Sequence, residues 1–337
     1  MKYPKFIKQG DTIGVTAPSE GIIKNFDLIR LNNVKNNINN LGFKYIETDN
    51  VRKNNLGRSD IAQNRAEQFM KLWKNNDVSA ILMATGGDFL MEILEYLDFE
   101  YIENSKPKWI QGYSNITTLS FIFTTMLDIA TIYGPSAKSF GMRTLYRNLT
   151  DSISLMEGNE ITQESFNMCE GDQGSNDPLS EYILTKPCCW KSLNGENLIN
   201  FTGRSIGGCF DDVITLFGTK YDYIKTYIDK YKTDGIIWFL EVYEMTSSQI
   251  TRHLWQMKNA GYFENCKGIL FGRPLFVREE YDINFRDAVY SALNDLEIPI
   301  LYDVDIGHVA PQMPIVNGAI LNVKFENNKG TIKTLFK

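Results

Sequence analysis

The feature that most constrains the fold is an alternation of short apolar runs and amphipathic segments in the first half of the chain. The run Ile13–Ala17 predicts a strand, and the segment after it repeats apolar residues at helical spacing until Gly42. A second amphipathic segment precedes the apolar run Val78–Ala84, and further strand and helix segments follow it. Because strands that alternate with helices form mostly parallel sheets, the pattern predicts a doubly wound α/β domain.

The composition changes near residue 160. From about Glu160 to Asn200 the chain is rich in Asn, Gly, Ser, Glu and Pro, and its apolar residues follow no sustained period, which indicates a linker and a long loop. Beyond it, the apolar run Asp234–Glu241 and the helical segment Ser247–Gly261 predict a second mixed α/β domain. We therefore expect a first domain over residues 1–155, a linker and substrate-covering loop over 156–202, and a second domain over 203–337.

Charge and composition narrow the class of partner. The 337 residues include 35 Lys and Arg against 41 Asp and Glu, a formal net charge of −6, which disfavours a broad nucleic-acid surface. No segment reaches the ~18 apolar residues of a membrane span, and the first residues lack the apolar run of a signal peptide, so we expect a cytoplasmic protein without a membrane partner. Five cysteines and two histidines fit neither a disulfide framework nor a multi-histidine metal site, so we expect no metal.

The first candidate for chemistry is a serine between a predicted strand and a predicted helix. Gly112-Tyr113-Ser114-Asn115-Ile116 has the setting of a nucleophile elbow, where a tight turn exposes the serine hydroxyl at the carboxyl edge of the sheet. Backbone N–H groups at the start of the following helix are then free to bind an oxyanion. The pattern is incomplete because Ile116 stands in place of the usual second glycine. The alternative is a serine that only caps the helix.

A second candidate is the turn Thr85-Gly86-Gly87-Asp88, which follows the run Val78–Ala84. Paired glycines let the backbone approach a ligand closely and point N–H donors at a developing negative charge. The alternative is a simple tight turn. No G-x-G-x-x-G or G-K-[ST] pattern occurs, which disfavours a dinucleotide or P-loop site.

Two histidines and one acid complete the candidates. His308 lies in a loop with Gly and Pro directly after an apolar run, which favours a site over packing, whereas His253 lies within a predicted helix and is expected to pack or to face solvent. Glu241 ends an apolar strand, so its carboxylate is expected at a sheet edge in partly dry surroundings, and Glu244 is the alternative. Serine, glutamate and histidine then follow in the order Ser114, Glu241, His308, an order that does not exclude a catalytic triad.

These residues resemble motifs of the LD-carboxypeptidase family of serine peptidases, which also contains the microcin C immunity peptidases, and the chain is more similar to that second branch. The resemblance covers nearly the whole chain. It includes these motifs in the family's order: Ala17-Pro18-Ser19, Thr85-Gly86-Gly87-Asp88, Gly112-Tyr113-Ser114-Asn115, Gly207-Gly208, Phe217-Gly218-Thr219, Phe239-Leu240-Glu241, Gly307-His308, Pro314 and Gly318-Ala319. The chain departs from the family at Cys209-Phe210, where Asn-Leu is usual, and this departure concerns the wall of the substrate pocket.

The resemblance implies a Ser-Glu-His triad of Ser114, Glu241 and His308, and it implies no cofactor. It also implies oxyanion donors from the paired-glycine turn and from the residue after the serine, namely Gly87, Asp88 and Asn115. The fold implied is α/β, with an amino-terminal flavodoxin-like doubly wound domain and a carboxy-terminal swivelling β/α domain. The family further implies a homodimer.

Members of the family hydrolyse an amide near a free carboxylate. One branch removes the terminal D-alanine from cytoplasmic murein tetrapeptides, and the other cleaves the bond that joins a peptidyl aspartate to a nucleotide. In this chain Trp190 lies between Lys186 and Lys191 in the Glu160–Asn200 segment, and similarity to the nucleotide-cleaving branch implies that its ring stacks on adenine. The alternative is a tryptophan that covers apolar surface.

The sequence therefore predicts a serine carboxypeptidase or amidase that acts on a small peptide or a peptidyl- or aminoacyl-nucleotide. In this hypothesis His308 accepts the Ser114 proton, Glu241 orients the imidazole, and backbone N–H groups hold the oxyanion. One alternative is a murein tetrapeptide LD-carboxypeptidase that uses the same triad. An alternative of another class is a non-catalytic two-domain protein that binds a small molecule between its domains.

Overall fold

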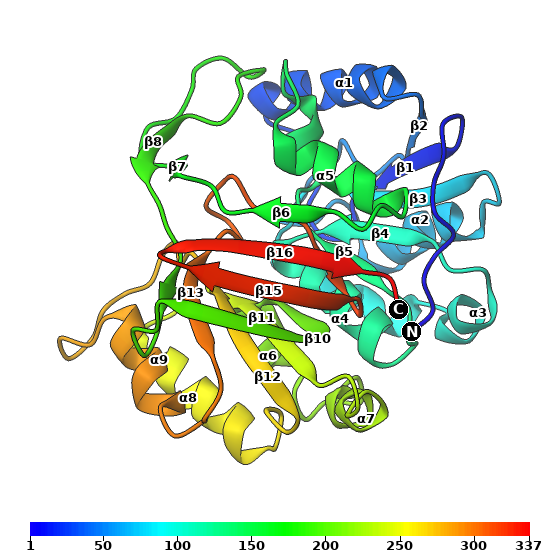
Figure 1. The fold of residues 1–337 in the computed structure, drawn as a ribbon. Helices are drawn as coiled ribbons and strands as arrows, with labels where there is room; N and C mark the ends of the chain where they lie inside the picture. The colour runs from blue at the N-terminus through cyan, green and yellow to red at the C-terminus, as the bar shows by residue number, and fades with distance from the viewer.

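The computed structural model describes residues 1–337 and contains two larger β-sheets with helices packed around them (Figure 1). The first has six strands in the order β14-β5-β4-β3-β1-β2, of which β1 to β5 run parallel and β14 antiparallel. Crossover helices join the parallel strands, which confirms the predicted doubly wound arrangement. The strands are β1 Thr12–Thr16, β2 Lys44–Glu47, β3 Val78–Met83, β4 Trp109–Gly112, β5 Thr131–Tyr133 and β14 Ile315–Asn317.

The helices of this half differ in how much of their surface is buried. On α2, Phe69, Leu72 and Trp73 are buried while neighbouring polar residues face solvent, as expected for a helix on one side of a sheet. Every residue of α4 is buried, because α4 packs against β4 and β5 on one side and against β10, α6 and α7 on the other. The helices are α1 Asn25–Asn40, α2 Ala62–Lys74, α3 Phe99–Asn104, α4 Thr117–Thr125 and α5 Arg147–Met156, with 3₁₀ segments η1 Leu90–Tyr96, η2 Ser114–Ile116 and η3 Ala137–Gly141.

The second sheet has eight strands in the order β6-β16-β15-β10-β11-β12-β13-β9. Its centre, β10 to β13, is parallel, and the strands on both sides of that centre are antiparallel. The strands are β6 Thr162–Glu164, β9 Lys191–Ser192, β10 Leu198–Cys209, β11 Ile236–Glu241, β12 Cys266–Gly272, β13 Ile300–Val304, β15 Ile320–Glu326 and β16 Lys329–Leu335. The helices are α6 Phe210–Leu216, α7 Ile224–Lys230, α8 Ser247–Asn259 and α9 Phe285–Leu293.

The segment expected to be a linker and a long loop contains regular structure. Its strand β6 extends one edge of the second sheet and its strand β9 extends the other, while β7 Met168–Glu170 and β8 Leu184–Pro187 pair with each other (Figure 1). These strands have two to four residues and mostly exposed or half-exposed side chains, so they leave no apolar period in the sequence. The expectation of a segment without regular structure was wrong for this physical reason.

The two halves of the chain share one core. A single cluster of buried apolar side chains includes Ile110 and Phe121 from the first half and Phe210 and Trp238 from the second. The rings of Phe121 and Trp238 stack with centroids 6.2 Å apart. This shared packing fixes the carboxyl edge of the first sheet against that of the second, which is where the candidate residues lie. No helix combines the length and the apolar run that a membrane crossing requires.

Candidate active site

Ser114 lies on a strained turn between β4 and α4. Its φ of +61° is in the left-handed region, which a non-glycine residue rarely adopts, and its N–H donates to the hydroxyl of Tyr133 at 3.3 Å. A Cβ at Gly112 would lie 2.9 Å from the side chain of Ile116, so the first position of the turn requires glycine while Ile116 fills the place of the second glycine. The turn therefore has the backbone of a nucleophile elbow despite its incomplete sequence pattern.

Glu241 and His308 form a buried pair across the end of β11. The Nδ1 atom of His308 lies 2.9 Å from Oε1 and 3.0 Å from Oε2 of Glu241, whose side chain has no exposed surface. Gly307 has a φ of +99°, and a Cβ there would lie 2.5 Å from Oε2 of Glu241, so only glycine allows the loop to bring His308 this close. Glu244, the alternative partner, is exposed and forms no hydrogen bond or ion pair with His308, while its N–H donates to Asp211.

The charges around His308 are acidic. Burial alone lowers the pKa of the imidazole, but the charge and hydrogen bond of Glu241 and the charges of Asp211 and Asp212 outweigh burial and raise the pKa of His308 above its usual range. The acidic surroundings thus stabilise the protonated imidazole. A general base benefits from this because it carries the proton that it has accepted until the leaving group takes it.

Two tyrosines connect the serine turn with this pair. The hydroxyl of Tyr133 donates to Oε1 of Glu241 at 2.5 Å while it accepts the N–H of Ser114. The ring of Tyr113 packs edge-on against the imidazole of His308 at a centroid distance of 5.0 Å. No hydrogen bond joins the Ser114 hydroxyl to His308, and the links between the serine turn and the His308–Glu241 pair run through these two tyrosines.

The paired-glycine turn lies beside the serine. A Cβ at Gly86 would lie 2.9 Å from Cβ and 3.1 Å from Oγ of Ser114, so this glycine permits the contact. Gly87 has a φ of +137°, and the N–H groups of Gly87 and Asp88 donate to no acceptor within the protein. Free N–H donors this close to a serine side chain are what an oxyanion hole requires.

The side chain of Asn115 ties this turn to its neighbours. Its Oδ1 accepts the N–H of Leu90 at 2.8 Å and the hydroxyl of Ser19 at 2.9 Å, and its Nδ2 donates to Asp212 at 2.6 Å. Burial raises the pKa of Asp212 to about 7 even though the Asn115 hydrogen bond opposes the shift. Asn115 thus links the residues on both sides of the glycine turn's surroundings, Ser19 and Leu90, to Asp212 of α6.

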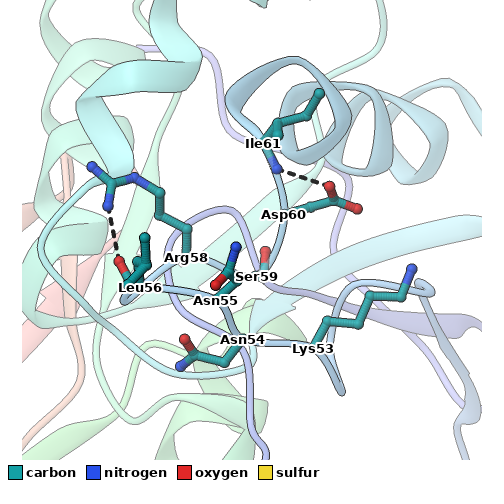
Figure 2. A pocket seen from close by; sticks show the side chains of 8 residues that line it. All are labelled: Lys53, Asn54, Asn55, Leu56, Arg58, Ser59, Asp60 and Ile61. Atoms are coloured by element: carbon teal, nitrogen blue, oxygen red, sulfur yellow. Dashed lines mark hydrogen bonds between the residues drawn. The ribbon is translucent and has the colours of Figure 1, made fainter.

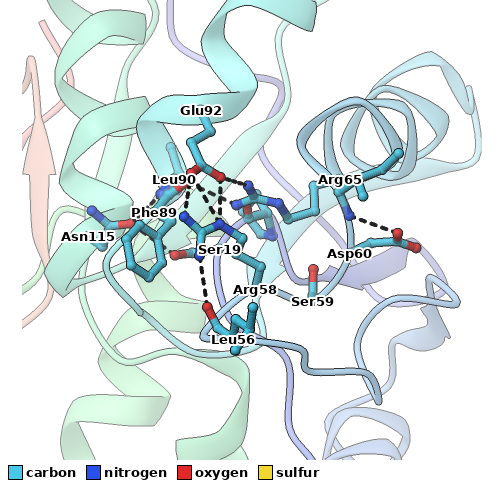
Figure 3. A network of polar contacts seen from close by, with 12 residues as sticks. Ser19, Leu56, Arg58, Ser59, Asp60, Arg65, Phe89, Leu90, Glu92 and Asn115 are labelled. Atoms are coloured by element: carbon cyan, nitrogen blue, oxygen red, sulfur yellow. Dashed lines mark hydrogen bonds and ion pairs between the residues drawn. The ribbon is translucent and has the colours of Figure 1, made fainter.

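Two arginines, Arg58 and Arg65, bind residues next to the paired-glycine turn (Figure 3). The fully buried Arg65 donates from Nη1 to the carbonyls of Pro18 and Phe89, both at 3.0 Å, and from Nη2 to Glu92 at 2.5 Å. Arg58 binds the same carboxylate at 2.6 Å and covers the ring of Phe89 at 3.6 Å. The hydrogen bond from Arg58 holds the pKa of Glu92 below its usual range. A charge-assisted network therefore keeps the turn in one place.

A cavity of about 400 Å³ lies along the loop of residues 53–61 (Figure 2). This loop is joined to the surroundings of the glycine turn, because Asn54 donates to Glu20 at 2.5 Å and Gly57 lies against the ring of Phe89. The lining residues are Lys53, Asn54, Asn55, Leu56, Arg58, Ser59, Asp60 and Ile61.

Trp190 does not lie where the sequence interpretation placed it. Its ring has no exposed surface, its Nε1–H donates to Oδ2 of Asp305 at 2.6 Å, and a side chain at Gly330 would overlap the ring. Asp305 also pairs with the buried Arg273. The expectation that Trp190 stacks on a base was therefore wrong, and the alternative, a tryptophan that covers apolar surface, matches the structure. The reason is that residue 190 leads directly into β9 at the sheet edge.

The remaining candidate, His253, lies on α8 away from this cluster. Its Nδ1 is 3.4 Å from Oε1 of Gln256 and its ring packs against Phe210. Sequence reasoning missed Tyr133 and Arg65, although Tyr133 ends a strand just before Gly134-Pro135, which is a signal for the carboxyl edge of the sheet.

A serine on a strained strand-to-helix turn, free N–H donors beside it, and a histidine paired with a buried carboxylate make an arrangement typical of serine hydrolases. Comparison with protein families narrows this class. The LD-carboxypeptidase N-terminal domain matches residues 13–134, and the LD-carboxypeptidase C-terminal domain matches residues 202–323. The chain belongs to the LD-carboxypeptidase family of serine peptidases.

Relatives are similar over almost the whole chain. A Vibrio cholerae protein named as a carboxypeptidase is 27% identical over 97% of this chain and 96% of its own length. The microcin C7 self-immunity protein MccF of Escherichia coli is 25% identical over 96% of this chain and 93% of its own length. A Bacillus subtilis protein named as a murein peptide carboxypeptidase is 24% identical over 94% of this chain and 89% of its own length.

Solved structures show the same fold. An MccF-like protein from Bacillus anthracis superposes with a TM-score of 0.83 at 24% identity and full coverage of both chains. An MccF-like protein from Streptococcus pneumoniae, solved in complex with AMP, has a TM-score of 0.78 at 23% identity, with 97% of this chain and 99% of that chain covered. The two-domain mixed α/β architecture predicted from the sequence is confirmed.

Proposed function

We propose that this chain hydrolyses an amide bond next to a carboxylate through a triad of Ser114, His308 and Glu241. The observation that carries the proposal is the buried His308–Glu241 pair at 2.9 Å, which the hydroxyl of Tyr133 links to Ser114, a serine with a φ of +61°. A serine that only capped α4 would need neither the left-handed backbone nor an acid-paired histidine nearby.

The proposed reaction proceeds in two stages. Nε2 of His308 takes the proton from Oγ of Ser114 as Oγ attacks the carbonyl carbon, and the N–H groups of Gly87, Asp88 and Asn115 stabilise the oxyanion. The imidazolium then gives the proton to the leaving nitrogen, the amide bond breaks, and an acyl-enzyme remains. Water, deprotonated by His308, releases the acid and restores Ser114.

The substrate we propose is a peptidyl- or aminoacyl-nucleotide. This is supported by the similarity to MccF along both chains and by the AMP complex of the structurally similar MccF-like protein. The second candidate is a murein tetrapeptide with a terminal D-alanine, which is supported by the Bacillus subtilis relative.

Labelling with a fluorophosphonate tests the nucleophile. We expect the probe to modify the wild-type protein and not Ser114→Ala, with Ser120→Ala, which removes a buried hydroxyl within α4, as the matched control that still reacts. Equal labelling of all three would refute Ser114 as the nucleophile, and no labelling of the wild type would favour the non-catalytic binding protein. A panel of aspartyl amides of adenosine-containing amines and murein tetrapeptide then decides between the two substrates.

A further inference from the structure

Two aromatic side chains, Tyr243 and Phe276, lie next to His308 on the second sheet, and we refer to this pair as the aromatic shelf. The ring of Tyr243, which follows β11, lies 4.3 Å from the imidazole of His308 at an interplanar angle of 35°. The ring of Phe276, which follows β12, packs against Tyr243 with centroids 5.4 Å apart and an angle of 77°. Tyr243 is half-buried and Phe276 is 54% exposed, so the shelf leads from the candidate base to solvent.

The backbone holds the shelf in place. The N–H of Phe276 donates to the carbonyl of Tyr243 at 2.8 Å, and the N–H of Leu275 donates to that of Val242 at 3.2 Å. From the other side, Asp211 accepts the N–H of Tyr243 at 3.0 Å. The two loops therefore hold the rings of Tyr243 and Phe276 in a fixed position next to the imidazole of His308.

The proposed chemistry of the triad indicates which part of the substrate lies on the aromatic shelf. His308 must protonate the leaving nitrogen, so the leaving group lies against the imidazole and extends along whatever surrounds it. Tyr113 packs edge-on against the ring, and Tyr243 lies 4.3 Å from it in a more parallel arrangement that continues to Phe276. A leaving group as small as alanine is too short to reach an exposed side chain beyond Tyr243, whereas a nucleoside carries a planar ring of the size that aromatic side chains stack on.

We propose that Tyr243 and Phe276 form the subsite for an aromatic base on the leaving group of the hydrolysed amide. This inference rests on the proposed triad, and it assigns to these two residues the stacking contact that the buried Trp190 cannot make.

The test compares two substrates with the same acyl part, an aspartyl amide of an adenosine-containing amine and an aspartyl-alanine peptide. Phe276→Ala is the informative variant because Phe276 does not touch His308, and Tyr281→Ala is the matched control, an 84% exposed ring on the same loop without a contact to Tyr243. We expect Phe276→Ala to lower the ratio of kcat/KM for the adenosine substrate over the alanine substrate by about 5- to 30-fold, as for loss of one base stack, and Tyr281→Ala to leave the ratio within twofold.

Binding to the inactive protein separates this inference from the proposed function. Adenosine binding is measured by calorimetry on Ser114→Ala with and without Phe276→Ala, and we expect the second change to weaken it about 5- to 30-fold. That result without hydrolysis by the wild type would refute the proposed function and keep the subsite. An unchanged ratio of kcat/KM together with unchanged adenosine binding would overturn the subsite. A dimeric wild type that becomes monomeric in Phe276→Ala would also overturn it, because the shelf would then be a contact between two copies of the chain.

Discussion

The two sides of the candidate site are held in place by different means. On the first sheet, Ser114 and the turn at Gly86 are positioned by strained backbone and by neutral hydrogen bonds, with the charged Arg65 network behind them. On the second sheet, His308 is positioned by a hydrogen bond with the buried carboxylate of Glu241 among further acids. Substitutions on the serine side should therefore lower kcat without moving its pH dependence. Substitutions on the histidine side should change both kcat and the pH dependence of kcat/KM.

Removal of the imidazole should have the largest effect. His308→Ala is expected to lower kcat by roughly 10⁴- to 10⁶-fold, because the triad acts as a unit, whereas His253→Ala should leave kcat within a factor of a few. Steady-state kinetics on the two variants measure this directly. The reverse pattern would mean that the site has been assigned to the wrong face of the second sheet.

Trp190→Ala should be the most damaging change to stability. The ring is fully buried and its N–H pairs with Asp305, so its loss is expected to lower the free energy of unfolding by about 3–5 kcal/mol. Trp255→Ala on α8, where the ring is 60% exposed, should cost less than about 1 kcal/mol. Denaturant unfolding compares the two. A stable Trp190→Ala protein that loses only its activity on adenosine substrates would restore the stacking role.

Tyr133→Phe should break the link between the two sides. The hydroxyl joins the Ser114 N–H to a buried carboxylate, so we expect kcat to fall about 10- to 100-fold, in line with the ~1.5–3 kcal/mol of a hydrogen bond to a charged group, with little change in KM. Tyr227→Phe is the matched control, since its buried hydroxyl donates to the carbonyl of Ser205 away from the site. If both variants lose stability and neither loses rate, Tyr133 has no role beyond packing.

The pH profile should show the smallest but most specific effect. Because the pKa of His308 is raised, the imidazole stays protonated to a higher pH, and kcat/KM should fall on the acid side with an apparent pKa above the ordinary value of about 6.5. Glu241→Gln removes the charge that raises this pKa, so the acid limb should move to lower pH in the residual activity. Glu244→Gln, which changes an exposed acid that forms no hydrogen bond or ion pair with His308, should leave the limb in place. A limb that moves only in the Glu244 variant would reverse the assignment of the acid.

The sequence predicted the parts of the site that follow from local pattern. Ser114, Glu241 and His308 each follow or end an apolar run, and in each of the two sheets the parallel strands bring their carboxyl ends to one edge, so these residues could be selected as candidates without a structure. The contacts of Tyr133 with Glu241 and of Tyr243 with His308 could not, because they join residues more than 60 positions apart in the sequence and leave no spacing signal.

The prediction for the Glu160–Asn200 segment was wrong for a different reason. Its strands are too short to show a period, and the burial of Trp190 depends on the bare backbone of Gly330 in another strand. The position of β14 in the first sheet is equally invisible, because Ile315–Asn317 pairs with β5 across most of the chain.

Substitution of Ser114 tests its role as the nucleophile of a triad with His308 and Glu241. The most direct test measures kcat and melting temperature together for the wild type and Ser114→Ala on an aspartyl amide of an adenosine-containing amine. We predict a fall in kcat of roughly 10⁴- to 10⁶-fold with a nearly unchanged melting temperature, because the change removes a hydroxyl and no core volume. Turnover retained within tenfold in a folded Ser114→Ala protein would contradict the account.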